Sequence, residues 1–168
     1  PIKVLDAKKV ILTLADNTTN TITDSSRLST EEDYSAAIYS KEDLIINGNG
    51  TLNVNAGYRN GIKSTDDCII VSGTLNITST EDGIIGKDLC GVVAGDININ
   101  AGSDGIKSTY DTDTTKGNVI IEGGNITIKA SNDGIQAENI LVINDGTINI
   151  KTNNGAADTT QTHIDNMD

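Results

Sequence analysis

The feature that most constrains this chain is an internal repeat with a period of about 22 residues. Each unit contains a glycine, a small polar residue, an apolar-polar-apolar triplet, a short polar turn and a second glycine. The leading glycines are separated by 23, 22, 29 and 22 residues, so one unit carries an insertion of about seven residues. The leading glycines are Gly50, Gly73, Gly95, Gly124 and Gly146, and the second glycines are Gly61, Gly83, Gly105, Gly134 and Gly155.

Hydrophobic alternation inside each unit predicts β-strands. Apolar and polar residues alternate with period two after each leading glycine, which is typical of a strand with one buried face. A second apolar run, such as Ile69–Val71, precedes each leading glycine, and a third short strand follows the second glycine, as at Ile62. The equivalent inward positions of the regular strand are Leu52, Leu75, Ile97, Ile126 and Ile148.

Three short strands per unit, all running in the same direction, cannot form hairpins. They form a coil in which each strand pairs in parallel with its counterpart one turn later, ~4.8 Å away. The 25 Ile and 8 Val residues, with only 2% aromatics, supply an aliphatic core that suits strands. A leucine-rich repeat shares the period, but the chain has nine Leu and no helical periodicity. We therefore predict an all-β protein, a right-handed parallel β-helix (solenoid) with coils of about 22 residues and three short strands per coil.

The repeat predicts a single β-helix domain over residues 1–168. Ile38–Leu44 aligns with Ile62–Cys68 at an offset of 24 residues, and Val10–Leu14 has the composition of a still earlier strand. We interpret residues 1–43 as irregular coils with a polar loop near 24–35, residues 44–155 as regular coils, and residues 156–168 as a tail or cap. Because neither end carries a capping helix, we expect the chain to be a piece of a longer solenoid.

The charge balance limits the partners. Twelve basic and 24 acidic side chains give a net charge of −12, which disfavours nucleic acid and anionic membrane surfaces. The longest apolar run is Ile140–Ile143, far below the ~18 residues that a membrane span needs, so we expect no membrane insertion.

Acidic residues recur at two places in the repeat and are candidate metal ligands. One set, with amides at its ends (Asn60 and Asn154), precedes the second glycine, and another set follows it. Stacked like charges repel one another, and Ca²⁺ relieves this repulsion by taking six to eight oxygen ligands. Asp-Gly and Asn-Gly are also favoured turn dipeptides, so the turn interpretation stays open for each residue. The predicted metal ligands are Asp66, Asp67, Asp82, Asp88, Asp104, Asp111, Asp113, Asp133 and Glu138.

Three other features have open interpretations. The insertion Tyr110–Gly117, with acids at 111 and 113, is a cation clamp, a ligand-contact loop or a solvated loop. Cys68 and Cys90 lie 22 residues apart at the same point of adjacent coils, where buried free thiols are favoured over a disulfide. The outer face of the regular strand is a grid of Thr and Asn, which suits either a polymer of hydroxyls or simple solubility. His163, the single histidine, is given no role.

Several runs resemble a family of bacterial carbohydrate-binding proteins with a polysaccharide-lyase-like β-helix. They are Ala37–Leu44, Asp82–Asp88, Ser103–Thr109 and Asn132–Glu138, and the resemblance covers nearly the whole chain. It implies binding of plant cell-wall polysaccharide, notably acidic pectin (polygalacturonate) and cellulose, together with several Ca²⁺ ions and a secreted or cell-surface location. It assigns calcium binding to the acids in or beside these runs, which are Asp66, Asp67, Asp82, Asp88, Asp104, Asp111, Asp133 and Glu138. Asn60 and Asn154 depart from the acidic pattern, which weakens terminal sites.

The expected function is therefore non-catalytic, calcium-stabilised binding of acidic polysaccharide, with calcium bridging protein and uronate carboxylates. One alternative is a calcium-dependent pectate-lyase-like enzyme with Lys87 as base, although neighbouring carboxylates favour the charged form of that lysine. Another is a structural solenoid that associates end to end through its unpaired strands. The candidate ligand contacts are Tyr58, Arg59, Lys63, Lys107 and Tyr110.

Overall fold

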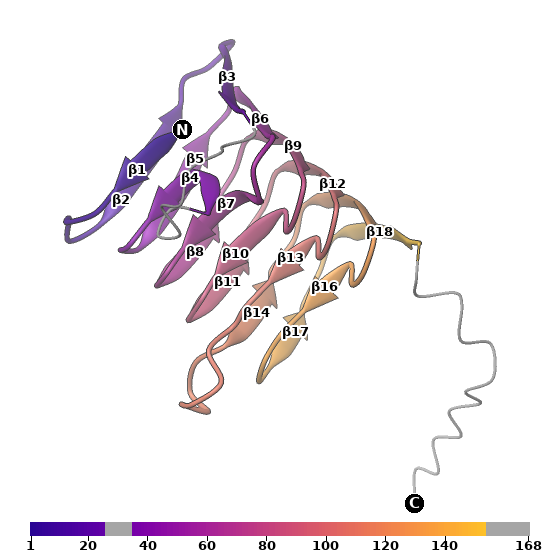
Figure 1. Cartoon of the computed structure of the whole chain (residues 1–168). Helices are drawn as coiled ribbons and strands as arrows, with labels where there is room; N and C mark the ends of the chain where they lie inside the picture. Colours follow the sequence, from indigo (N-terminus) through magenta and orange to yellow (C-terminus); the bar gives the residue numbers. More distant parts are fainter. Residues whose placement is uncertain (26–34, 154–168) are drawn as a thin grey trace, which may run out of the picture.

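The computed structural model describes residues 1–25 and 35–153. Most of the polar loop predicted near 24–35 lies outside the described residues, as do Asn154, Gly155, His163 and the predicted tail at 156–168. Six coils stack into a solenoid, and each coil gives one strand to each of three six-stranded sheets (Figure 1). The predicted all-β, right-handed parallel β-helix is confirmed. Within the described residues no helix combines the length and apolarity that a membrane crossing requires.

The three sheets collect equivalent strands of successive coils. Sheet A contains β1 (Ile2–Val4), β4 (Ala36–Ser40), β7 (Asn60–Ser64), β10 (Ile84–Gly86), β13 (Ile106–Lys107) and β16 (Ile135–Gln136). Sheet B contains β2 (Val10–Leu14), β5 (Leu44–Gly48), β8 (Asp67–Ile70), β11 (Leu89–Val92), β14 (Asn118–Ile121) and β17 (Leu141–Ile143). Sheet C contains β3 (Thr19–Asp24), β6 (Thr51–Ala56), β9 (Thr74–Ser79), β12 (Asp96–Ala101), β15 (Asn125–Ala130) and β18 (Thr147–Thr152).

The register follows the repeat. Ile97 pairs with Leu75 on one side and with Ile126 on the other, so identical positions form ladders along the solenoid. The insertion falls between β13 and β14 and protrudes as a loop (Figure 1). An extra loop at a corner leaves the pairing of the sheets unchanged, which explains why the register resumes after it.

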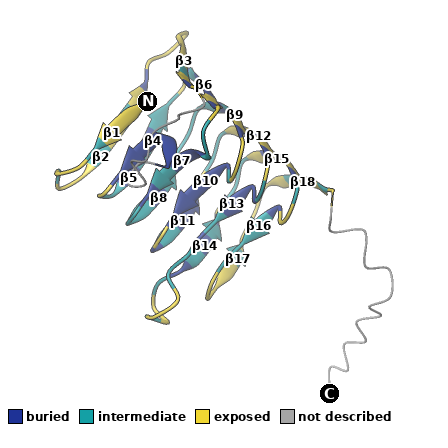
Figure 2. Ribbon diagram, in the orientation of Figure 1, coloured by how far each residue is buried: buried dark blue, intermediate teal, exposed yellow. Residues whose placement is uncertain are grey.

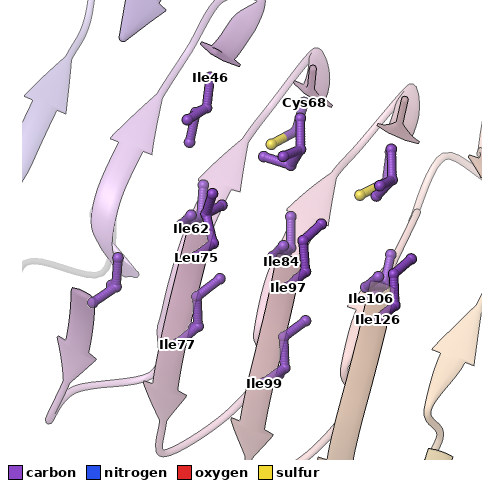
Figure 3. Close-up of a cluster of buried hydrophobic side chains, with 14 of the residues drawn as sticks. Ile46, Ile62, Cys68, Leu75, Ile77, Ile84, Ile97, Ile99, Ile106 and Ile126 are labelled. Atoms are coloured by element: carbon purple, nitrogen blue, oxygen red, sulfur yellow. The ribbon is translucent and has the colours of Figure 1, made fainter. Parts of the chain in front are cut away.

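The core is a set of aliphatic ladders. Leu75, Ile97 and Ile126 are each 0% exposed, and the close-up shows them stacked with their neighbours inside the coil (Figure 3). Cys68 and Cys90 face each other in register in β8 and β11, both buried and both free. Burial raises the pKa of Cys68 well above its ordinary value and that of Cys90 to about 12, so both are neutral thiols of the core.

A tight corner between sheets B and C explains the leading glycine. Gly73 and Gly95 have φ of 109° and 115°, a region that side-chain-bearing residues avoid. A Cβ added at Gly95 would lie 2.6 Å from the carbonyl oxygen of Gly73, so stacked corners leave no room for a side chain.

The outer faces of the three sheets differ in chemistry. Sheet C carries the predicted polar grid. On sheet B the outward residues Ile45 and Ile69 are paired and half-buried, and Gly91 separates them from Ile120, the next half-buried isoleucine of this outer row. Sheet A, the most deeply buried sheet in its middle strands (Figure 2), presents Lys63 and Lys107 on either side of the buried Ile85.

Candidate functional site

The short strands of sheet A separate the acidic residues into two groups. Asp82 and Asp104 lie in the turns that lead from sheet C into sheet A. Asp66 and Asp88 lie in the turns that lead from sheet A into sheet B. Since β10 has only three residues, both groups flank the lysine-bearing outer face of sheet A.

The first acidic group is held by the backbone of the next coil. The Asp82 N–H donates to Asn60 Oδ1, the Asp104 N–H donates to Asp82 Oδ1, and the Asp133 N–H donates to Asp104 Oδ1, each at 3.0 Å. One carboxylate or amide oxygen per coil therefore satisfies a turn amide, which explains why both Asn and Asp occur at this position. These contacts need no cation.

Basic side chains accompany this acidic ladder. Lys107 Nζ lies 2.6 Å from Asp104 Oδ2, and Lys63 Nζ donates to Ser35 Oγ at 3.2 Å. Burial lowers the pKa of Lys63, partly opposed by the charge of Asp82, so Lys63 is the lysine of this face whose charge is least favoured. Arg59 adopts φ of 58°, pairs with Glu81 at 3.8 Å and lies 5.5 Å from the centroid of the Tyr58 ring.

The second group contains a true carboxylate cluster. Asp43, Asp66 and Asp67 each present an oxygen within 4.8 Å of the other two, and within residues 1–25 and 35–153 this is the one such group of three. Asp43 precedes β5 and Asp67 begins β8, and the residues that follow them, Leu44 and Cys68, are paired in register. The parallel pairing of adjacent coils therefore brings these acids together.

A buried serine shapes the turn that carries the cluster. Ser64 is 0% exposed, its hydroxyl donates to the carbonyl oxygen of Glu42 at 2.9 Å, and it accepts the Asp66 N–H at 3.1 Å. Both coils are thus tied to one hydroxyl directly beside the acids. The turn holds Asp66 in place even though its carboxylate is repelled by its neighbours.

The cluster is electrostatically strained. Burial, a hydrogen bond with Asp88 and the charges of Asp43, Asp88 and Asp67 raise the pKa of Asp66 to about 6. Burial and the charges of Asp43 and Asp88 also raise the pKa of Asp67. Three hard oxygen donors in mutual repulsion fit a divalent cation, with carbonyls or water completing the six to eight ligands of Ca²⁺.

The inserted loop contacts the neighbouring coil through a lysine. Lys116 Nζ lies 2.5 Å from Asp88 Oδ2, and the Tyr110 ring has Lys87 Nζ 4.7 Å and Lys116 Nζ 4.9 Å from its centroid. Asp113 Oδ1 accepts the N–H and the hydroxyl of Thr115 inside the loop, which lowers the pKa of Asp113. Lys116 of the loop therefore balances the charge of Asp88, and Asp113 stabilises the turn within the loop itself.

Of the nine predicted metal ligands, the structure brings Asp66 and Asp67 together, with Asp88 beside them. Glu138 is exposed, and its N–H donates to Ser108 Oγ. Sequence reasoning missed Asp43. The signal was present, because aligning Ile38–Leu44 with Ile62–Cys68 places Asp43 opposite Asp67. The predicted ligands outside the cluster are Asp82, Asp104, Asp111, Asp113, Asp133 and Glu138.

The coil geometry places the chain among β-helices of the polysaccharide-lyase-like class. A solved structure described as the polysaccharide lyase-like protein from C. thermocellum, in a gadolinium derivative, matches this chain with a TM-score of 0.76 and 31% identity. The match covers 92% of this chain and 69% of that one. A family described as carbohydrate-binding domain-containing protein matches residues 1–168, and the chain belongs to this family.

A curated relative agrees with this family. It is a carbohydrate-binding domain-containing protein of Acetivibrio thermocellus, 38% identical over 81 residues. The matched region covers 46% of this chain and 28% of the relative, so the chain spans only part of that protein's length. The family resemblance seen in the sequence is confirmed.

Proposed function

We propose that this chain is a non-catalytic module that binds acidic plant cell-wall polysaccharide, polygalacturonate in particular, through calcium held at Asp43, Asp66 and Asp67. Membership in a carbohydrate-binding family supports the ligand class. The observation that carries the calcium proposal is the approach of three carboxylates to within 4.8 Å at the junction of two coils. Because the natural ligand lies outside the cell, the proposal includes secretion or display at the cell surface.

Charge explains why binding at the acid cluster needs a metal. A protein of net charge −12 repels a polyuronate chain, and the acid cluster is one of its most repulsive points. Bound Ca²⁺ supplies positive charge and open coordination positions for ligand carboxylates. Lys63 and Lys107, on the outer face of sheet A between the two acidic groups, are further candidate contacts for the ligand.

The test compares two variants that change charge in different places. Asp66→Asn combined with Asp67→Asn removes two of the three carboxylates of the cluster. Asp145→Asn instead changes an exposed acid of the β17–β18 turn, where Asp145 Oδ1 accepts the N–H of Gly146. We expect calorimetry to show loss of calcium binding in the double variant only. Retention of polygalacturonate in affinity electrophoresis falls in parallel, and chelation of the wild type reproduces the loss.

Other outcomes contradict the proposal in distinct ways. Equal retention with and without chelator removes calcium from the mechanism. Calcium binding without polygalacturonate or cellulose retention makes the metal structural and favours the end-to-end fibre alternative.

One observation favours catalysis as a second candidate function. A β-elimination needs a lysine or arginine that gives up its proton easily, and burial lowers the pKa of Lys63 rather than favouring its charge. Lys87, the base proposed from sequence, is exposed beside Tyr110. Ultraviolet detection of unsaturated uronides from polygalacturonate, lost in Lys63→Gln, would establish this alternative; no product over extended incubation rejects it.

A further inference from the structure

We propose that the outer face of sheet C, over its C-terminal coils, is a second and calcium-independent subsite for acidic polysaccharide, in which Lys129 and Lys151 bind the carboxylates. The ligand class rests on the proposed function. The site itself rests on separate residues, on a different sheet from the acid cluster.

The lysine pair is the first observation. Lys129 in β15 and Lys151 in β18 are paired in register on parallel strands, and both are exposed. Neighbouring strands lie ~4.8 Å apart, and like charges placed directly opposite destabilise a sheet. The ion pairs found among the described residues are made by other lysines and by Arg59, so these two ammonium groups have no carboxylate partner there. An anionic ligand would supply one.

Two adjoining hollows in the same face are the second observation. One, of about 250 Å³, is lined by Asn100, Lys129, Ser131, Lys151 and Asn153. The other, of about 260 Å³, continues over β9 and β12 and shares Asn100 and Lys129 with the first. Together they form a shallow track across neighbouring coils, with Lys129 where the two hollows meet and Lys151 at the C-terminal end.

A ladder of oriented amides beside the track is the third observation. Asn76 Nδ2 donates to Asn53 Oδ1 at 2.9 Å, and Asn98 Nδ2 donates to Asn76 Oδ1 at 3.0 Å. Each contact fixes its amide in one orientation and leaves the second N–H of the NH₂ group pointing elsewhere. Side chains fixed in advance lose little entropy on binding, so the ladder is a preorganised array for hydroxyl groups.

The combination selects one ligand chemistry. Amides at a spacing set by the coils suit the repeated hydroxyls of a linear sugar polymer, and adjacent lysines suit its carboxylates. A nucleic acid binds through many phosphate contacts from a basic surface, whereas this face combines only two lysines with a row of neutral amides that suit sugar hydroxyls. The structure therefore favours a polyuronate over other polyanions.

The experiment measures polygalacturonate binding in chelator and low salt, where the calcium-dependent site is silent. We expect Lys129→Gln with Lys151→Gln to weaken this residual binding roughly tenfold, since each lysine makes an exposed charged contact. The matched control is Lys8→Gln with Lys41→Gln, two exposed lysines of the N-terminal coils, and it leaves binding unchanged. Lys129→Arg with Lys151→Arg keeps the charge and retains binding.

Three results overturn the subsite. The first is the absence of chelator-resistant binding in the wild type, and the second is equal binding of the glutamine variant. The third is equal binding of fully methyl-esterified pectin, because carboxylate recognition then plays no part. The Asp66→Asn and Asp67→Asn double variant tests the proposed function instead, because it should lose only the binding that requires calcium. Failures of the two ideas are therefore distinguishable.

Discussion

At the scale of single residues, acids that share a pattern in the sequence have different roles because their neighbours differ. The oxygens of Asp82 and Asp104 accept backbone N–H groups of the next coil. Asp66 instead faces Asp43, Asp67 and Asp88, and these charges together with burial destabilise its ionised form. An acid that is costly to ionise without metal is well placed to gain from binding one.

This difference predicts that Asp66→Asn raises the thermal stability without calcium and lowers it with calcium. The pKa of Asp66 is about 6 in the folded protein against an ordinary value of 3.8, so the stability that its protonation contributes is fully present below about pH 4 and is lost as the pH rises through 6. In chelator at pH 7 the variant should therefore melt at a higher temperature than the wild type. The difference should shrink at pH 4, and in excess calcium the variant should melt lower. Thermal denaturation by circular dichroism measures all three conditions, and a variant that is less stable in chelator at pH 7 contradicts the repulsion argument.

At the scale of elements, the corners between strands decide which positions tolerate a side chain. Gly95 combines a positive φ with a close approach to the preceding corner. At Gly91, in β11, an added Cβ would make only ordinary van der Waals contact, with the nearest atom of Ile69 at 3.5 Å. The two glycines are four residues apart in one coil. Only at Gly95 does the backbone conformation require a glycine.

We therefore expect opposite results from the two alanine substitutions. Gly95→Ala should destabilise the protein by about 1–3 kcal/mol, through an unfavourable backbone conformation and contact with Gly73. Gly91→Ala should be neutral or stabilising by about 0.5–1 kcal/mol, since it restricts the unfolded chain and fills a gap in the outer ladder of sheet B. Urea unfolding of both variants gives the comparison, and similar losses at the two positions would refute the role given to the corner.

At the scale of the whole molecule, the repeat was sufficient to predict the fold, because period-two alternation and a fixed coil length determine which residues stack. The column through Leu75, Ile97 and Ile126 lies in the register that the repeat implies. The site was harder to predict, since it depends on contacts across turns. Equal spacing in sequence cannot distinguish a carboxylate that accepts the next coil's amide, as Asp82 does, from one that meets another carboxylate, as Asp67 does. The burial of Lys63 could not be predicted from the sequence either, because it also depends on contacts between neighbouring coils.

A solenoid also predicts that the same substitution has a different effect in different coils. Stability in such a fold is approximately a sum of coil and nearest-neighbour terms, so an inner residue is packed from both sides and a residue of the last described coil from one. Ile99 and Ile150 belong to one inward column, yet their exposed fractions are 3% and 47%. Ile99→Ala should cost about 2–5 kcal/mol, the range for a fully buried isoleucine, and Ile150→Ala about half as much or less. Urea unfolding with matched m-values tests this, and equal losses at the two positions would show that the last coil is packed on both sides in solution, as end-to-end association would produce.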